Sequence, residues 1–262
     1  MKKYIRLYII FIKYSFMQAM MYKADFMIWS LVTVGWIFLN LLFYQFLYLN
    51  VTEIAGWTKP QLLVLLGFYF VIDFFLWGVL WQNMRKIPEI INRGQLDLVL
   101  TKPVNTQFLL SFKGIGFDDI HGLLIGLVTI VYALSIGNIK PSVADILLST
   151  AALGVALVYI YAAWFITVCA AFWFDRIENL HLLFPSLRQI WRVPQPFYKG
   201  ILQKILTFVI PATLVTTVPA QFLLRKPSLP LFITLIIFAV VSLKLSTWVL
   251  KVALRHYSGA SS

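Results

Sequence analysis

Apolar residues occur in runs of about twenty along most of the chain, and short polar stretches separate these runs. A helix that rises about 1.5 Å per residue needs roughly 20 apolar residues to cross the hydrocarbon core of a bilayer. The clearest runs cover residues 27–49, 61–81, 120–136, 146–174 and 229–250. The pattern therefore predicts an all-α, polytopic membrane protein that forms a single transmembrane domain over residues 1–262.

The composition agrees with this prediction. Of the 262 residues, 61% are hydrophobic and 12% are charged, whereas about a quarter of the residues in soluble domains are charged. The mean hydropathy is +0.85. None of the connecting stretches is long enough to hold a separate soluble enzyme.

The charge is strongly basic, with 22 Lys and Arg against 10 Asp and Glu and a formal net charge of +12. In a soluble protein this charge would suggest nucleic acid, but in a membrane protein it marks cytoplasmic flanks that meet anionic lipids. We therefore expect membrane lipids and no nucleic acid as partners. The basic loop 82–119 and both termini are expected in the cytoplasm, which requires an even number of crossings.

The first 25 residues resemble a signal peptide because Lys2, Lys3 and Arg6 precede an apolar stretch. Lys13 interrupts that stretch, however, and no small-residue cleavage site follows. At helical spacing Lys2, Arg6 and Lys13 share one side. Residues 1–25 are therefore predicted to form an uncleaved amphipathic helix in the inner headgroup layer.

The fifth crossing is ambiguous. Hydropathy alone selects residues 201–224, but Pro211 and Pro219 break this run. The alternative is a crossing at residues 177–193, followed by a re-entrant helical hairpin over residues 197–224 in the outer leaflet. Both versions give six transmembrane helices, and the apolar pattern by itself favours the first.

Few residues suggest catalysis. The chain has a single cysteine, Cys169, no HExxH motif and no P-loop, so we expect no metal site, no bound cofactor and no ATP hydrolysis by the chain itself. Asp73 lies near the middle of the second run, where an ionisable side chain is costly. It is either an ion site or the structural partner of a basic group such as Lys244.

Two alternative functions follow from these residues. Asp73 could serve an ion-coupled secondary transporter, although the two halves of the chain show no convincing repeat. The adjacent pair Asp118 and Asp119 could belong to a membrane-embedded lipid-modifying enzyme, although acids also favour a helix N-terminus.

Within residues 85–97, the string from Arg85 to Gly94 predicts a short cytoplasmic helix, with Pro88 in its first turn and Gly94 just past its end. Ile87, Ile90 and Ile91 would form an apolar face beside charged residues. Such a helix either docks a cytoplasmic partner or packs on its own bundle.

The chain resembles the membrane subunits of ABC-2-type ATP-binding-cassette exporters over nearly its whole length. The likeness includes YKADF at residues 22–26, Gly56-Trp57, INRGQLDLVLTKPV at residues 91–104, FVIP at residues 208–211 with Pro219-Ala220, and the tail LRHYSGASS at residues 254–262. The order and spacing of these motifs together carry the resemblance.

The resemblance implies a permease subunit of an ATP-driven exporter in a bacterial plasma membrane. Two ATPase subunits would carry ATP and Mg²⁺, and a second permease subunit, identical or related, would complete the pathway. It assigns the ATPase-coupling role to Arg85, Ile87, Pro88, Glu89, Ile90, Ile91, Arg93, Gly94, Leu96 and Asp97. It also reverses the preference for the fifth crossing to residues 177–193, with Pro211 and Pro219 in the hairpin, which places Arg188 and Arg192 deep in the membrane or outside it. No substrate is implied.

Overall fold

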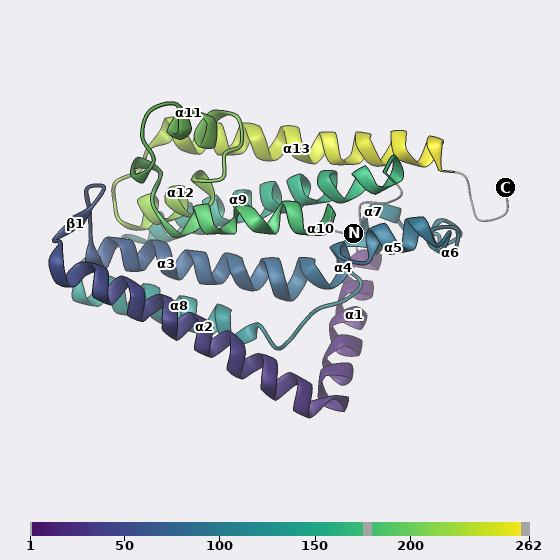
Figure 1. Ribbon diagram of the computed structural model, residues 1–262, viewed down its shortest axis with the longest axis horizontal. Helices are drawn as coiled ribbons and strands as arrows, with labels where there is room; N and C mark the ends of the chain where they lie inside the picture. The colour runs from purple at the N-terminus through teal and green to yellow at the C-terminus, as the bar shows by residue number, and fades with distance from the viewer. Residues whose placement is uncertain (1, 175–179, 258–262) are drawn as a thin grey trace.

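The computed structural model describes residues 2–174 and 180–257. Its long helices α2 (Lys23–Asn50), α3 (Lys59–Phe74), α9 (Val143–Cys169) and α13 (Leu229–His256) run along the length of an elongated bundle (Figure 1). Within the described residues, four helical stretches are long and apolar enough to cross a membrane, at Lys23–Asn50, Lys59–Asn92, Val143–Phe172 and Leu229–Arg255. These stretches confirm an all-α, multi-pass membrane protein.

The predicted crossing at residues 120–136 coincides with α8 (Ile120–Ile136), which is apolar but shorter than these four helices. The total of six crossings therefore stays a prediction.

A tight hairpin joins α2 to α3. Strands β1 (Glu53–Ile54) and β2 (Trp57–Thr58) pair antiparallel around Ala55 and Gly56. Both turn residues have positive φ, +52° and +76°, as a two-residue hairpin turn that matches the strand twist requires. The side chain of Gln61 then accepts a hydrogen bond from the Thr58 amide at 3.3 Å, which caps the start of α3.

α3 forms the centre of the bundle and packs most extensively against α8. The two helices approach closely at Gly67 and Gly126, where a Cβ added to Gly126 would lie 2.8 Å from the carbonyl oxygen of Gly67. Small residues permit this approach of two backbones inside a membrane. α3 continues into a π-helical segment, η1 (Phe75–Trp81), and then into α4 (Gln82–Met84).

The outer helices are far less covered than this centre. Only 11% of the most apolar stretch of α2 is buried, against 78% for the stretch that begins with α3. α9 packs against both α13 and α12 (Leu214–Leu223). The apolar side chains of α2 that remain exposed are suited to lipid or to another membrane subunit.

The N-terminal helix α1 (Lys2–Met21) runs across the direction of the long helices (Figure 1). It packs along the segment that contains α7 (Thr106–Phe112): the ring centroids of Tyr4 and Phe108 are 5.1 Å apart, and the Ser15 hydroxyl accepts a hydrogen bond from the Ile115 amide at 3.1 Å. Lys2, Arg6 and Lys13 remain exposed. Residues 2–21 thus form the predicted helix, and its place in the inner headgroup layer stays a prediction.

The described part of the ambiguous region contains short helices. These are α10 (Leu180–Leu183), the 3₁₀ segments η3 (Pro185–Arg192) and η4 (Gln195–Phe197), α11 (Gly200–Phe208) and α12. Residues 175–179, at the start of the predicted crossing 177–193, lie outside the described residues, and residues 180–193 do not form one continuous α-helix.

A continuous helix is also not found over residues 201–224. α11 ends at Phe208 and α12 begins at Leu214, with Pro211 between them, because proline lacks the amide that a continuing helix would need. Pro219 lies inside α12, and its carbonyl accepts a hydrogen bond from the Ser149 hydroxyl at 2.8 Å. Two short helices over residues 200–223 are compatible with the predicted hairpin, whose place in the outer leaflet stays a prediction.

Candidate functional site

The predicted loop helix forms as α5 (Ile87–Asn92). Pro88 occupies its first turn, where no amide is needed, and Gly94 follows its end with φ of +66°. α6 (Asp97–Leu100) comes next, at the same end of the bundle as the start of α1 and the end of α13 (Figure 1). The local start and stop signals were therefore correctly identified from the sequence.

The apolar face of α5 packs on the protein's own bundle. α5 contacts α9 and the short 3₁₀ helix η2 (Ala170–Phe172) that follows it. Ile87, Pro88, Ile91 and Leu96 are buried, and Ile90 is half-buried. These five members of the predicted coupling set therefore hold the helix in place and leave contact with a partner to the other side.

The exposed side of this segment is charged. Arg85, Glu89, Arg93 and Asp97 are exposed, and the Glu89 carboxylate pairs with the Arg93 guanidinium at 3.1 Å. An exposed pair of this kind contributes little to stability, so its charges are available to a partner. Leu98, which the sequence analysis did not single out, is 70% exposed beside Asp97 and adds an apolar contact point to this surface.

Asn83 connects α4 to the next loop. Its side-chain amide donates hydrogen bonds to the carbonyls of Val79 and Gly114 at 2.9 and 2.8 Å, and its side-chain oxygen accepts from the Gly114 amide at 2.8 Å. Because Asn83 lies four residues before Ile87, a displacement of α5 would reach the loop that leads to Asp118 and Asp119.

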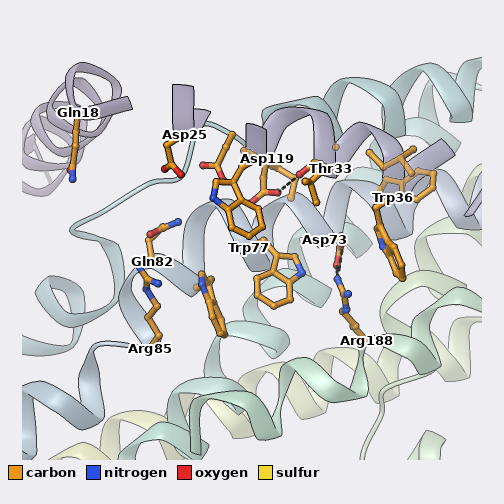
Figure 2. A pocket seen from close by; sticks show the side chains of 18 residues that line it. Gln18, Asp25, Thr33, Trp36, Asp73, Trp77, Gln82, Arg85, Asp119 and Arg188 are labelled. Atoms are coloured by element: carbon orange, nitrogen blue, oxygen red, sulfur yellow. Dashed lines mark hydrogen bonds and ion pairs between the residues drawn. The ribbon is translucent and has the colours of Figure 1, made fainter. Parts of the chain in front are cut away.

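A cavity of about 770 Å³ lies between α2, the α3–η1 helix and the start of α8 (Figure 2). Its charged lining consists of Asp25, Asp73, Asp118, Asp119, Arg85 and Arg188, and its aromatic lining includes Trp29, Trp36, Trp77 and Trp81. This volume lies within the range of roughly 300–1,000 Å³ that is usual for small-molecule sites. The cavity therefore brings Asp73, the intramembrane residue singled out from the sequence, together with the adjacent acidic pair.

Asp73 is ion-paired with Arg188. One guanidinium nitrogen of Arg188 lies 3.2 and 3.3 Å from the two carboxylate oxygens. The guanidinium also lies over the rings of Trp77 and Trp36, 5.1 and 5.8 Å from their centroids. Lys244, named from the sequence as a possible partner, is exposed on α13.

Arg192 anchors the same segment one turn further on. Its Nε donates to the Tyr69 hydroxyl at 3.2 Å, and its backbone carbonyl accepts from the Tyr44 hydroxyl at 2.7 Å. Its guanidinium lies 5.1 Å from the centroid of Trp36. Both arginines of η3 thus have partners on α2 and α3, and their depth in the membrane stays a prediction.

Asp119 makes a contact that its sequence neighbourhood does not reveal. It stands directly before α8, as expected of an acid at a helix start, but its carboxylate accepts a hydrogen bond from the Thr33 hydroxyl of α2 at 3.0 Å. Burial, followed by the negative charge of Asp118, raises the pKa of Asp119 to about 6. This carboxyl group therefore changes charge close to physiological pH.

Comparison with known proteins supports a single family. The model of the family described as ABC-2 family transporter protein matches residues 34–261. No curated protein and no solved structure shows a significant match to the chain. The matched region contains the α5–α6 surface and all of the cavity lining except the part contributed by Gln18, Asp25, Trp29, Val32 and Thr33. The chain belongs to the ABC-2 transporter family and is a transmembrane permease component of an ABC transporter.

Proposed function

We propose that the chain is the membrane half of an ATP-driven exporter in a bacterial plasma membrane, with both termini in the cytoplasm. Two permease subunits, identical or related, form the translocation pathway, and two separate ATPase subunits bind at the α5–α6 surface. The observation that carries this proposal is the position of α5, whose apolar face is packed on the bundle while its charged face is exposed.

This packing of α5 suits the transmission of movement from a bound ATPase subunit to the bundle. Because Ile87 and Ile91 are buried against the bundle, a push on the exposed charges moves α5 together with α9 and η2. The hydrogen bonds of Asn83 extend this movement to the loop before α8. A partner shifts a conformational equilibrium only if it makes different contacts in the two states, and we assign these differential contacts to Arg85, Glu89, Arg93 and Asp97.

The test reverses the charges of one pair. The variant Glu89→Lys with Arg93→Glu retains an ion pair in α5 but presents the opposite order of charges to the ATPase. We expect normal membrane insertion, with ATP hydrolysis no longer coupled to transport in inside-out vesicles. The matched control is Glu53→Lys with Lys140→Glu, two exposed residues in the turns at the other end of the bundle, for which coupling should be unchanged.

Two results would contradict the proposal. ATP-dependent transport by the reversed variant at the wild-type rate would remove the coupling role of α5. Movement of solute by the purified chain in vesicles that contain no nucleotide-hydrolysing subunit would remove the exporter assignment. Mass measurement of the complex isolated in mild detergent should show two permease and two ATPase subunits.

A further inference from the structure

We propose that the cavity between α2, the α3–η1 helix and α8 binds organic cations with an apolar or aromatic body, and that free cations of this class are the transported solutes. The transport part of this inference rests on the proposed function. Cation binding itself is a property of the permease chain and requires no ATPase.

The first support is charge. Among the described residues that line this cavity are four of the ten acidic residues of the chain, Asp25, Asp73, Asp118 and Asp119, and two arginines. Arg188 is already paired with Asp73, so the other charged groups of the described lining are three carboxylates and the single guanidinium of Arg85. A cavity that is acidic inside a chain of net charge +12 selects for a positive ligand, because charges in a partly desolvated cleft are weakly screened.

The second support is the aromatic lining. Four tryptophans face the cavity, and two of them, Trp36 and Trp77, already hold a cation, since the guanidinium of Arg188 lies over both rings while it pairs with Asp73. Tryptophan faces attract cations more strongly than other rings do. The protein's own side chain thus demonstrates a combination of carboxylate and tryptophan that would also suit an incoming cation.

The third support is the size and polarity of the remaining wall. The cavity measures about 770 Å³, and apolar side chains such as Val32, Ile37 and Phe70 complete its lining. Figure 2 shows Asp73, Asp119 and Trp77 around this common space. A bare inorganic cation would use only the carboxylates, whereas an organic cation also covers the tryptophan and aliphatic surfaces.

The decisive comparison uses two probes of nearly the same shape and opposite charge, tetraphenylphosphonium and tetraphenylborate. Their binding to the purified full-length chain is measured in dodecyl maltoside without nucleotide, by equilibrium dialysis against protein-free micelles. We expect saturable binding of tetraphenylphosphonium and none of tetraphenylborate. Equal binding of both probes, or no binding of the phosphonium, would overturn the inference without any need for a variant.

Variants locate the site. Asp119→Asn and Asp25→Asn should each weaken tetraphenylphosphonium binding about tenfold, the size expected when one nearby charge is lost from a partly buried site. Glu53→Gln removes an exposed carboxylate from the α2–α3 turn, and Trp248→Leu removes an exposed tryptophan from α13; both should bind as the wild type does. Wild-type affinity in both aspartate variants would place the probe elsewhere and overturn the assignment.

A second arm separates a free cation from a lipid headgroup, because choline carries the same chemistry. The dialysis is repeated in nanodiscs of phosphatidylcholine. If the affinity for tetraphenylphosphonium is the same in these nanodiscs as in detergent, free cations are supported as the ligands. If the affinity falls only in the nanodiscs, the choline headgroup competes for the cavity, and the free cation is overturned as its natural ligand. A chain that fails to bind the phosphonium but still assembles with ATPase subunits would contradict only the substrate class. A chain that binds it but never assembles would contradict only the proposed function.

Discussion

The ion pair between Asp73 and Arg188 should be strongly coupled energetically, and a double-mutant cycle tests this. The two side chains are 16% and 20% exposed, and their charged atoms are 3.2 Å apart. Removing one partner from a buried pair costs roughly 3–5 kcal/mol because the other charge is left uncompensated. Since these side chains retain some exposure, we expect the lower end, about 3 kcal/mol of unfolding free energy, for Arg188→Leu.

The double variant Asp73→Leu with Arg188→Leu should recover most of this loss, because no unpaired charge remains. It keeps a deficit of about 1 kcal/mol for the lost contact of the guanidinium with Trp36 and Trp77. The double variant is then about 2 kcal/mol more stable than Arg188→Leu alone. The coupling energy is this difference plus the loss caused by Asp73→Leu alone, hence at least about 2 kcal/mol, well above the error expected for independent sites.

The measurement is equilibrium unfolding of the purified chain in mixed micelles with increasing dodecyl sulfate, followed by helical circular dichroism at constant pH. Arg85→Leu is the control, since Arg85 lines the same cavity but is exposed, and its removal should change the unfolding free energy by less than about 0.5 kcal/mol. If the losses of the two single variants simply add in the double variant, the reasoning about the pair is refuted.

Three further predictions concern the packing of α8 on α3, the hydrogen bonds between Asn83 and Gly114, and the pH dependence of cation binding. Gly126→Ala should destabilise the protein by about 1–3 kcal/mol, because the new methyl group meets the backbone of α3. The control Gly154→Ala adds a methyl group with no atom within 4 Å and should be neutral or slightly stabilising. Thermal unfolding of the two variants in detergent distinguishes these outcomes. Asn83→Ala should cost about 2 kcal/mol through its lost hydrogen bonds and should increase amide exchange of residues 113–116. Tetraphenylphosphonium binding should strengthen as the pH rises through about 6, because Asp119 then becomes negative. Asp119→Asn should abolish this part of the pH dependence of binding. An unchanged pH dependence in Asp119→Asn would show that another group is responsible.

The raised pKa of Asp119 also has a consequence for folding. Its carboxyl group titrates near pH 6 in the folded chain and near 3.8 as the ordinary value. For an acid with a raised pKa, the folded state is favoured when the group is protonated, so stability is lost as the pH rises from about 4 to about 6. Asp119→Asn should remove this loss, and unfolding measured at pH 5 and pH 7.5 checks the sign.

Periodicity and composition were sufficient to predict the membrane class, the long helices and the existence of a short helix at α5, although this helix covers only Ile87–Asn92 of the predicted residues 85–97. These features depend on local signals: an apolar run of the required length, a proline in a first turn and a glycine after a last turn all act within a few residues. The amphipathic α1 belongs to the same class, because the spacing of Lys2, Arg6 and Lys13 already separates its two sides. The family resemblance, confirmed by the match over residues 34–261, likewise depends on short motifs in order.

Only the tertiary packing could reveal which side of α5 is exposed and which charged side chains form ion pairs. The isoleucines of α5 had two possible destinations, a partner or the bundle, and periodicity is the same in both cases. Arg188 is separated from Asp73 by 115 positions, and Thr33 from Asp119 by 86; no local pattern relates such residues. Hydropathy alone favoured residues 201–224 for the fifth crossing, because a hydropathy scale treats every charge, including those of Arg188 and Arg192, as unpaired. In the folded chain the Arg188 guanidinium lies beside the Asp73 carboxylate and over the rings of Trp36 and Trp77, and only the packing of η3 against α2 and α3 could establish this arrangement.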